Sequence, residues 1–291
     1  MGSAFNLNQF AIITCSYRPD FHRCQRLCAS IDKWVQPEIE HVLIVPKRDL
    51  NLFKALSSER RKVVSVESIV PGRYIQLPFT NKWWLDSRGW PVRGWIMQQI
   101  TKLSACHATM AEHLLYADSD IQFIAPLKIE ALIHDEKLRL HRIPNAMDHG
   151  LHLTWHKVAS RLLGIEEQYS GADYIGQLIS WRSSILKKLQ SHIEATTQKK
   201  WNLAVGQELR FSEYILYGSY VDRVLEDQTQ HFSTDKDLSY CCWDDKDVEN
   251  LTNGTKPLRD EVCVLFQSNL DLTPEQEERL LGTLLSNKPI V

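Results

Sequence analysis

Two aspartates, Asp118 and Asp120, stand out because they follow a short apolar run and precede another apolar segment. Side chains two residues apart on a strand point to the same side, so both carboxylates can converge at a strand end. Carboxylates that close repel each other unless a cation lies between them, and a hard divalent cation with oxygen ligands is the usual partner. A solvated turn is the alternative, because Asp-x-Asp alone is a common sequence.

The chain before these aspartates alternates between buried strands and helical segments. The expected elements, in order, are a strand at 10–14, a helix at 21–31 and strands at 41–46 and 62–66. This order and spacing predict the opening of a doubly wound α/β sheet. Ligands of such sheets bind at the carboxyl ends of the strands.

Polar loops follow the first two strands and would border that binding region. Their candidate contacts to the base and ribose of a nucleotide are Thr14, Ser16, Arg18 and Asp49. Ordinary turn chemistry explains each residue equally well. The sequence contains neither a glycine-rich dinucleotide loop nor a phosphate-binding loop, so a bound nucleotide would need another means of neutralising its phosphates.

A helix predicted over residues 95–107 leads almost directly into the strand before Asp118. Its apolar residues recur at helical spacing and form one core face. Gln99 and Lys102 lie off that face, which indicates either a solvated surface or side chains that lean over the metal site toward a phosphate.

Residues 70–95 contain four tryptophans in a segment too interrupted by proline and glycine to form one long helix. Aromatic faces with charged neighbours suit sugar rings, whose C–H faces are apolar and whose rims are polar. A structured loop folded over its own aromatic cluster is the alternative.

Several of these motifs together resemble nucleotide-sugar-dependent glycosyltransferases of the GT-A fold. They are Trp95-x2-Gln98-Gln99-x2-Lys102-Leu103, the segment Leu114 to Asp120, and Phe123-x2-Pro126. The opening loops and strands are similar to a bacterial group of glycosyltransferase-like proteins with an Asp-x-Asp motif. The resemblance is best over residues 10–130 and extends to about residue 270.

The resemblance implies a GT-A-like, Rossmann-related α/β fold with a mixed, mostly parallel sheet flanked by helices. We expect one catalytic domain over residues 1–291. Residues 10–130 would be its nucleotide-sugar-binding half and residues 131–291 its acceptor-binding half.

The resemblance also assigns roles to the motifs. It implies that Asp118 and Asp120 bind Mn²⁺ or Mg²⁺, with Asp120 the more direct ligand, and that Lys102 and Gln99 lie near the donor diphosphate or sugar. The cation would offset the diphosphate charge and act as a Lewis acid for its departure.

Three residues in the second half are further candidates. Asp173, in a glycine-containing loop, would be a carboxylate beside the donor sugar, and His231 would be a third metal ligand. Glu213 lies among apolar residues, where burial would raise its pKa toward the range of a general base. An ion pair between Glu213 and Arg210 is the alternative.

Histidines 149, 152 and 156 have helical metal-ligand spacing, but the segment lacks the glutamate of a His-Glu-x-x-His zinc site. A loop over the acceptor and generic surface histidines are both simpler interpretations of this segment.

The expected activity is metal-dependent transfer of a hexose from a nucleoside-diphosphate sugar to a glycan or lipid-linked glycan, as in bacterial surface-polysaccharide synthesis. A nucleotidyl- or phosphotransferase and a non-catalytic carbohydrate-binding protein are the alternatives. The stereochemistry stays open, since the Lys-Leu helix favours retention and Glu213 as a base favours inversion.

The composition limits the partners. A formal net charge of −2 and a pI near 6.6 give no basic field for nucleic acid, and we expect at most peripheral membrane association. No signal peptide is evident, and the odd, scattered cysteines favour reduced thiols in a cytoplasm over a disulfide framework. They are Cys15, Cys24, Cys28, Cys106, Cys241, Cys242 and Cys263.

Overall fold

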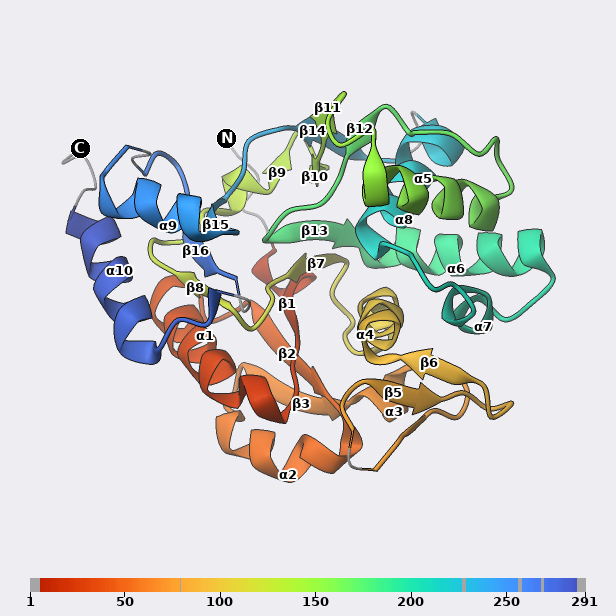
Figure 1. The fold of residues 1–291 in the computed structure, drawn as a ribbon, viewed down its shortest axis with the longest axis horizontal. Coiled ribbons are helices and arrows are strands. Elements are labelled where there is room, and N and C mark those ends of the chain that lie inside the picture. Colours follow the sequence, from red (N-terminus) through yellow and green to blue (C-terminus); the bar gives the residue numbers. More distant parts are fainter. Residues whose placement is uncertain (1–5, 79, 227–228, 256–257, 268–269, 287–291) are drawn as a thin grey trace.

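The computed structural model describes residues 6–78, 80–226, 229–255, 258–267 and 270–286. Its centre is a five-stranded sheet in the order β13-β7-β1-β2-β3 (Figure 1). The strands are β1 (Phe10–Cys15), β2 (Glu40–Val45), β3 (Arg61–Ser65), β7 (His113–Tyr116) and β13 (Ile179–Arg182). The first four are parallel, and β13 runs antiparallel to β7. The expected mixed α/β class with a mostly parallel sheet is confirmed.

Burial on both faces explains the continuous apolar runs of the central strands. Every residue of β1 is buried, as is typical of parallel strands covered by helices on both sides. Successive side chains serve different cores: Ile13 packs with the helices that follow β3, whereas Ile12 packs with α1 (Phe21–Trp34). The strands predicted at 10–14, 41–46 and 62–66 agree with the structure to within about a residue.

Helices cover both faces of this sheet. Figure 1 shows α1 on one side and a larger group of helices on the other. That group consists of α4 (Gly94–Leu103), α5 (Gly150–Leu163), α6 (Ser183–Thr197), α7 (Trp201–Gly206) and α8 (Glu213–Tyr220). A π-helical turn, Val221–Leu225, continues α8 directly.

Smaller sheets flank the central one. The sheet β15-β16-β8 joins β8 (Ile121–Phe123), β15 (Ser239–Cys242) and β16 (Cys263–Phe266), and α9 (Asp245–Thr252) and α10 (Pro274–Ser286) pack beside it. A second sheet joins β9 (Ile133–His134), β10 (Lys137–His141) and β14 (His231–Thr234). The remaining short elements are α2 (Leu50–Phe53), α3 (Val66–Ile69), β11 (Ile143–Pro144) and β12 (Ala172–Asp173).

The tryptophan-rich segment differs from the loop expected for it. It forms a three-stranded antiparallel sheet of β4 (Ile75–Gln76), β5 (Trp83–Leu85) and β6 (Pro91–Arg93). Trp84 is buried in the core, whereas Trp90 is 63% exposed. Trp83, the neighbour of Trp84 on β5, is 40% exposed because successive strand residues point to opposite faces, so the aromatic residues do not form one cluster.

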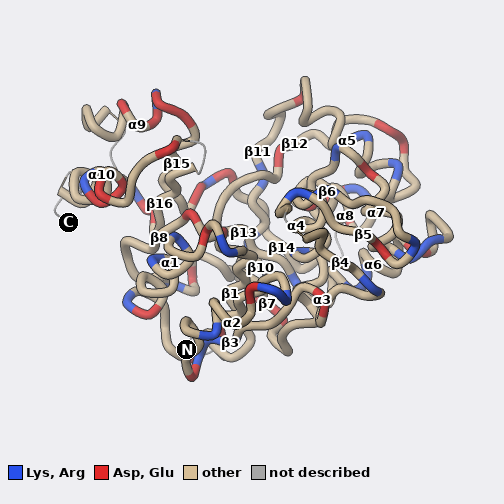
Figure 2. The backbone as a smooth tube through the Cα atoms, turned by 60° about the horizontal axis from the view of Figure 1, so that its bottom comes forward, with Lys and Arg blue, Asp and Glu red and all other residues tan. Residues whose placement is uncertain are grey.

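Charges are mixed along the backbone in Figure 2, with acidic residues gathered around α9. Within the described ranges, no helix has both the length and the apolar character needed to cross a membrane.

Candidate functional site

The two aspartates lie in the connection from β7 to β8, at the carboxyl edge of the central sheet. Backbone bonds fix this connection: the Ala117 N–H donates to the Ile13 carbonyl at 3.0 Å, and the Ile121 N–H donates to the Asp118 carbonyl at 3.2 Å. The sequence folds this way because β7 ends at Tyr116 beside β1, while Ile121 already pairs in the neighbouring sheet. Asp118 and Asp120 are thus held between two sheets.

Lys102 is the centre of the charge cluster at this edge. Its ammonium lies 3.0 Å from Asp118 Oδ1 and 3.2 Å from Glu213 Oε1, and it donates to the Tyr214 hydroxyl at 2.8 Å. The side chains of Lys102 and Glu213 are only 5% and 6% exposed. The three N–H groups of the ammonium therefore already have three partners, and we refer to Lys102, Asp118, Glu213 and Tyr214 as the lysine cluster.

Electrostatics keep this cluster charged. Burial alone would lower the pKa of Lys102, but the neighbouring Asp118, Tyr214 and Glu213 raise it well above its ordinary value. Burial raises the pKa of Glu213, which Lys102 opposes. Burial also raises the pKa of Tyr214, so its hydroxyl stays protonated. Lys102 thus stabilises carboxylates and does not lie on a solvated surface, and its contact with a donor phosphate stays a prediction.

Asp120 differs from Asp118 because no lysine contacts it. Its Oδ1 atom is buried and makes no hydrogen bond within the described part of the chain. Burial, followed by repulsion from Asp118, raises the pKa of Asp120 to about 7. A cation that binds in place of the proton would strongly stabilise the ionised form of such a carboxylate, because opposite charges nearby favour ionisation.

These two carboxylates fit a divalent cation that shares its ligands with a substrate. Among the described residues, no group of three or more His, Cys, Asp or Glu side chains is arranged to hold a metal ion. Mg²⁺ is typically bound through one or two carboxylates together with water and substrate phosphates, so two aspartates suffice for that kind of site. The lack of a complete protein cage is consistent with a cation delivered with a diphosphate.

Gln99 positions the helix that carries Glu213. Its Oε1 accepts a hydrogen bond from the Glu213 N–H at 3.0 Å, which satisfies one of the free donors at the start of α8. Its Nε2 is buried without a partner in the described residues. The structure thus places Gln99 beside the lysine cluster, where it orients Glu213.

The predicted nucleotide-binding loops are held by their own side chains. Asp49 is buried, accepts from the Arg18 N–H at 3.0 Å and lies 3.5 Å from Arg18 Nε. Thr14 is fully buried and donates to the Ala117 carbonyl at 2.8 Å. The expectation that Thr14 and Asp49 contact a nucleotide directly is therefore wrong. Ser16 and the 65% exposed Arg18 stay candidates.

Asp173 lies in β12, in the stretch that leads into β13. Its Oδ1 accepts from the Tyr174 N–H at 2.9 Å and lies 3.5 Å from His152 Nδ1. Burial raises the pKa of Asp173, and His152 opposes this shift. β13 begins at Ile179, opposite Tyr116, so Asp173 precedes by six residues the strand end that lies beside the Asp118 connection.

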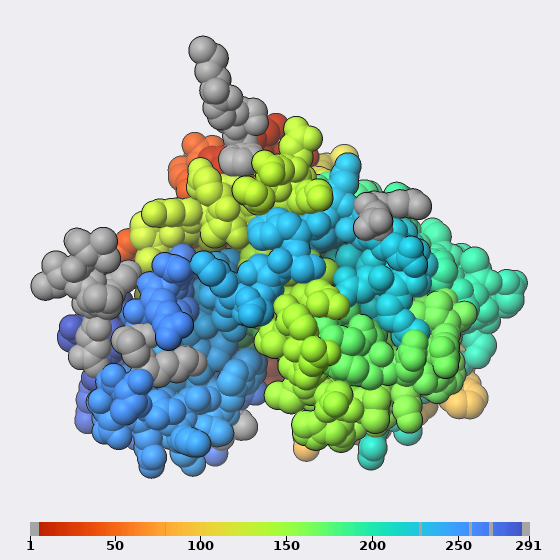
Figure 3. All heavy atoms as spheres, turned by 90° about the horizontal axis from the view of Figure 1, so that it is seen from above, coloured from red at the N-terminus to blue at the C-terminus, as the bar shows by residue number. Residues whose placement is uncertain are grey.

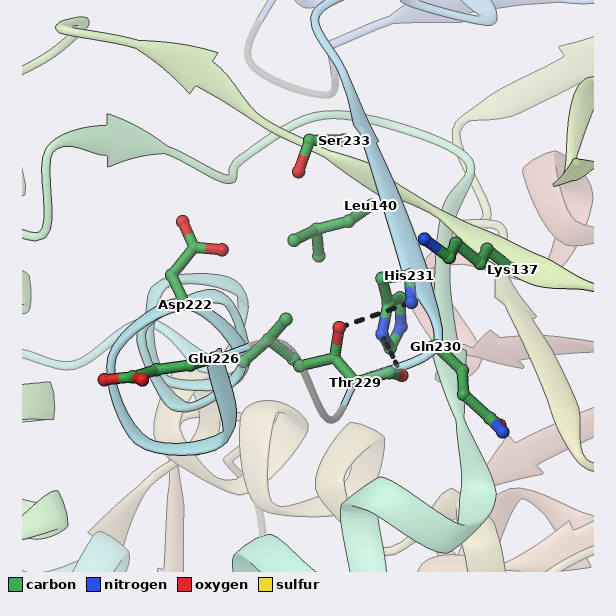
Figure 4. Close-up of a pocket in the computed structure, with 9 residues that line it drawn as sticks. Lys137, Leu140, Asp222, Glu226, Thr229, Gln230, His231 and Ser233 are labelled. Carbon is green, nitrogen blue, oxygen red and sulfur yellow. Dashed lines mark hydrogen bonds between the residues drawn. The ribbon is translucent and has the colours of Figure 1, made fainter. Parts of the chain in front are cut away.

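His231 does not join these carboxylates. Its Nε2 lies 3.2 Å from the Tyr217 hydroxyl and its Nδ1 lies 2.8 Å from the Thr229 carbonyl, in the polar pocket of Figure 4. Burial, followed by the charge of Arg182, lowers the pKa of His231 to about 3.

The register of β13 shows how far away this pocket is. The Tyr217 hydroxyl accepts from the Arg182 N–H, and Arg182 pairs with His113 at the start of β7. β7 runs from His113 to Tyr116 and a strand rises about 3.3 Å per residue, so this pocket lies about 10 Å from the strand end that precedes Asp118. The expectation that His231 is a third metal ligand is wrong.

The sequence pattern does not mark three residues near the aspartates as part of the site. Tyr214 shares the ammonium of Lys102, and Cys15 ends β1, where burial raises the pKa of its thiol to about 12. Burial and Asp118 raise the pKa of Asp20, although Arg23 opposes this shift. Asp20 directly precedes α1, and its side chain makes no capping hydrogen bond to the described residues of that helix.

The exterior is hollowed between two segments that are distant in the sequence. Figure 3 shows the hollow between the blue segment that carries α9 and the lime-green segment that leads into α5. The residues before α5 and the segment that carries α9 thus form opposite walls of the hollow.

The chain matches a known protein family. The model of DUF6492, described as a family of unknown function, matches residues 10–280. No curated protein matches the chain significantly.

Proposed function

This chain belongs to the DUF6492 family, and we propose that it is a metal-dependent glycosyltransferase. It would move a sugar from a nucleoside-diphosphate donor to a glycan or lipid-linked glycan. The observation that carries the proposal is the buried Oδ1 of Asp120, which has no hydrogen-bond partner among the described residues and lies beside the lysine cluster at the carboxyl edge of a parallel sheet.

The order of the strands in the central sheet also supports the proposal of a glycosyltransferase. Four parallel strands in the order β7-β1-β2-β3, with the antiparallel β13 beside β7, are compatible with the GT-A fold that the sequence resembles. Asp118 and Asp120 come directly after β7, where the Asp-x-Asp motif of that fold is expected.

The charge balance explains why a cation is needed. Asp118 and Glu213 carry two negative charges against the single positive charge of Lys102, and an ionised Asp120 adds a third negative charge. Asp120, with Asp118 beside it, would hold Mn²⁺ or Mg²⁺. Such an ion supplies Lewis-acid stabilisation of a departing diphosphate.

The chain's own residues prepare that site. Lys102 contacts both oxygens of Asp118 and fixes its orientation, and Gln99 and Tyr214 fix the start of α8. The ammonium of Lys102 lies 3.2 Å from Glu213 Oε1 and holds this carboxylate in an ion pair, so Glu213 is not free to accept the proton of an acceptor hydroxyl in this conformation. We therefore assign Glu213 a positioning role and leave Asp173 as the carboxylate facing substrates.

The test combines a turnover assay with a binding assay. Release of nucleoside diphosphate from a panel of nucleoside-diphosphate sugars should require Mn²⁺ or Mg²⁺ and fall at least 100-fold in Asp120→Asn. Calorimetric titration with Mn²⁺ and a nucleoside diphosphate should show cooperative binding that Asp120→Asn abolishes. Asp135→Asn changes an aspartate whose side chain is 85% exposed and serves as the matched control.

Two outcomes would contradict the proposal. Turnover that survives in the Asp118→Asn, Asp120→Asn double variant would exclude the metal assignment. Release of pyrophosphate from a nucleoside triphosphate, with nucleoside-diphosphate sugars left intact, would instead identify a nucleotidyltransferase.

A further inference from the structure

One face of α5 carries three ring nitrogens that are buried and make no hydrogen bond within the described residues. They are His152 Nδ1, Trp155 Nε1 and His156 Nε2. Their positions i, i+3 and i+4 place them side by side on the helix. Buried polar atoms almost always have a partner, so three such atoms on one face indicate a surface built to bind a polar molecule.

A carboxylate and a second tryptophan extend this surface. The ring of Trp155 lies 4.7 Å from that of His152 and 5.9 Å from that of Trp95, which is 41% exposed. Asp173 Oδ1 lies 3.5 Å from His152 Nδ1 without hydrogen-bond geometry. We call Trp95, His152, Trp155 and Asp173 the α5 face.

The contacts of Asp173 leave one oxygen available. Its hydrogen bonds from the Tyr174 and Ile175 N–H groups and its approach to His152 all use Oδ1. Oδ2 therefore has no partner in the part of the chain that the structure describes, and it can accept a hydrogen bond from a ligand hydroxyl.

This set of groups suits a sugar ring. An indole face covers the apolar C–H face of a pyranose, while indole and imidazole nitrogens and a carboxylate oxygen bond its hydroxyls. The carboxylate of Asp173 repels acidic sugars, so the ring that fits is uncharged.

The α5 face lies within reach of the lysine cluster. Trp95 and Lys102 are seven residues apart on α4, which puts them on the same side of the helix about 10 Å apart along its axis. Asp173 lies six residues before Ile179, which pairs with Tyr116 at the end of β7. A short saccharide stacked on the tryptophans can therefore extend toward Asp118.

We propose that the α5 face is the subsite for an uncharged pyranose of the acceptor, with Trp155 and Trp95 as the stacking platform and Asp173 Oδ2 and the His152 ring as the hydroxyl partners. The assignment of the α5 face to the acceptor rests on the proposed glycosyl transfer. The affinity of the α5 face for a sugar does not depend on that proposal.

The experiment measures sugar binding without nucleotide or metal. Methyl pyranosides and short uncharged oligosaccharides are titrated against the full chain, with saturation-transfer NMR for the sugar and tryptophan fluorescence for the protein. Trp155→Ala and Asp173→Asn should each weaken binding at least tenfold, and Trp155→Phe should retain most of it. Trp83→Ala and Trp90→Ala change exposed tryptophans on the β4-β5-β6 sheet and should bind like the wild type.

The outcomes separate this inference from the proposed function. Sugar binding that is lost in Trp155→Ala, while Mn²⁺ and nucleoside-diphosphate binding persists, supports the α5 face and shows that the variant is folded. Binding that follows Trp83 or Trp90, or no binding by the wild type, overturns the inference and leaves the donor site untouched. Intact sugar binding without any donor turnover overturns the transferase proposal alone.

Discussion

The lysine cluster and the α5 face are both polar and both largely enclosed, but their hydrogen bonds are satisfied in opposite ways. Each N–H of the Lys102 ammonium has a partner, whereas three ring nitrogens of α5 have none among the described residues. A closed network stabilises the fold and fixes its geometry, while an open one is completed only by a ligand. The comparison predicts that changes to the cluster cost stability and that changes to the α5 face cost binding.

Replacement of Lys102 by methionine should have the largest effect. It leaves Asp118 and Glu213 facing each other without a cation, and breaking a buried ion pair in this way costs about 3–5 kcal/mol. Urea unfolding at neutral pH should show this loss, and the loss should shrink at low pH as the carboxylates become protonated.

Lys236→Met is the matched control for that change. Its side chain is 78% exposed and lies 4.0 Å from Asp260, so its removal should change the unfolding free energy by less than about 0.5 kcal/mol. An unfolding free energy of Lys102→Met equal to that of the control would show that the cluster does not stabilise the fold.

Asp120 should make stability depend on pH when no divalent cation is present. Its folded-state pKa of about 7 lies above its unfolded value near 3.8, so the folded protein holds this proton more tightly. The unfolding free energy should therefore fall as pH rises from about 4 to about 7, by on the order of 3 kcal/mol after solvent screening.

Asp120→Asn removes the contribution of this titration. The pKa values of Asp20, Asp173 and Glu213 are also raised, so the contribution of Asp120 is the difference between the pH profiles of the variant and the wild type. Mn²⁺ should stabilise the wild type more at pH 8 than at pH 5, because it replaces the proton. Parallel pH profiles for the two proteins would contradict the position given to Asp120.

A substitution at Gly218, where α8 packs against Tyr174, should have a smaller effect on stability than the loss of Lys102. A Cβ at Gly218 would overlap the ring of Tyr174, the residue next to Asp173. Gly218→Ala should cost about 1–3 kcal/mol of unfolding free energy and also weaken sugar binding, since Tyr174 must move. Gly282→Ala, in α10 with open space around it, should instead stabilise the protein by about 0.5–1 kcal/mol.

The central sheet could be predicted from the sequence because its signals are local. Apolar runs such as Phe10 to Thr14 and the helical period after Asp20 show strand and helix directly. The strands of the tryptophan segment were missed, since two- and three-residue strands interrupted by turns produce too little alternation to distinguish them from a loop.

The site was less predictable because its contacts are long-range. Asp118 and Lys102 were placed together from their order along the chain, but the third partner, Glu213, comes from a helix about a hundred residues later. His231 was misplaced for the same reason: its residue type suits a metal, yet only the pairing of β14 with β10 determines which end of the sheet it reaches. The orphaned nitrogens of α5 become visible only when burial is known.

The position of Trp95 and Lys102 on one helix has a consequence for how this chain can change. A helix turns 100° per residue, so inserting or deleting a single residue between them would rotate the tryptophan a quarter-turn away from the lysine and shift it by about 1.5 Å. Segments on either side of α4 can lengthen freely, but the seven-residue interval inside it cannot. Sequences related to this one should therefore keep that interval free of insertions wherever they keep both residues.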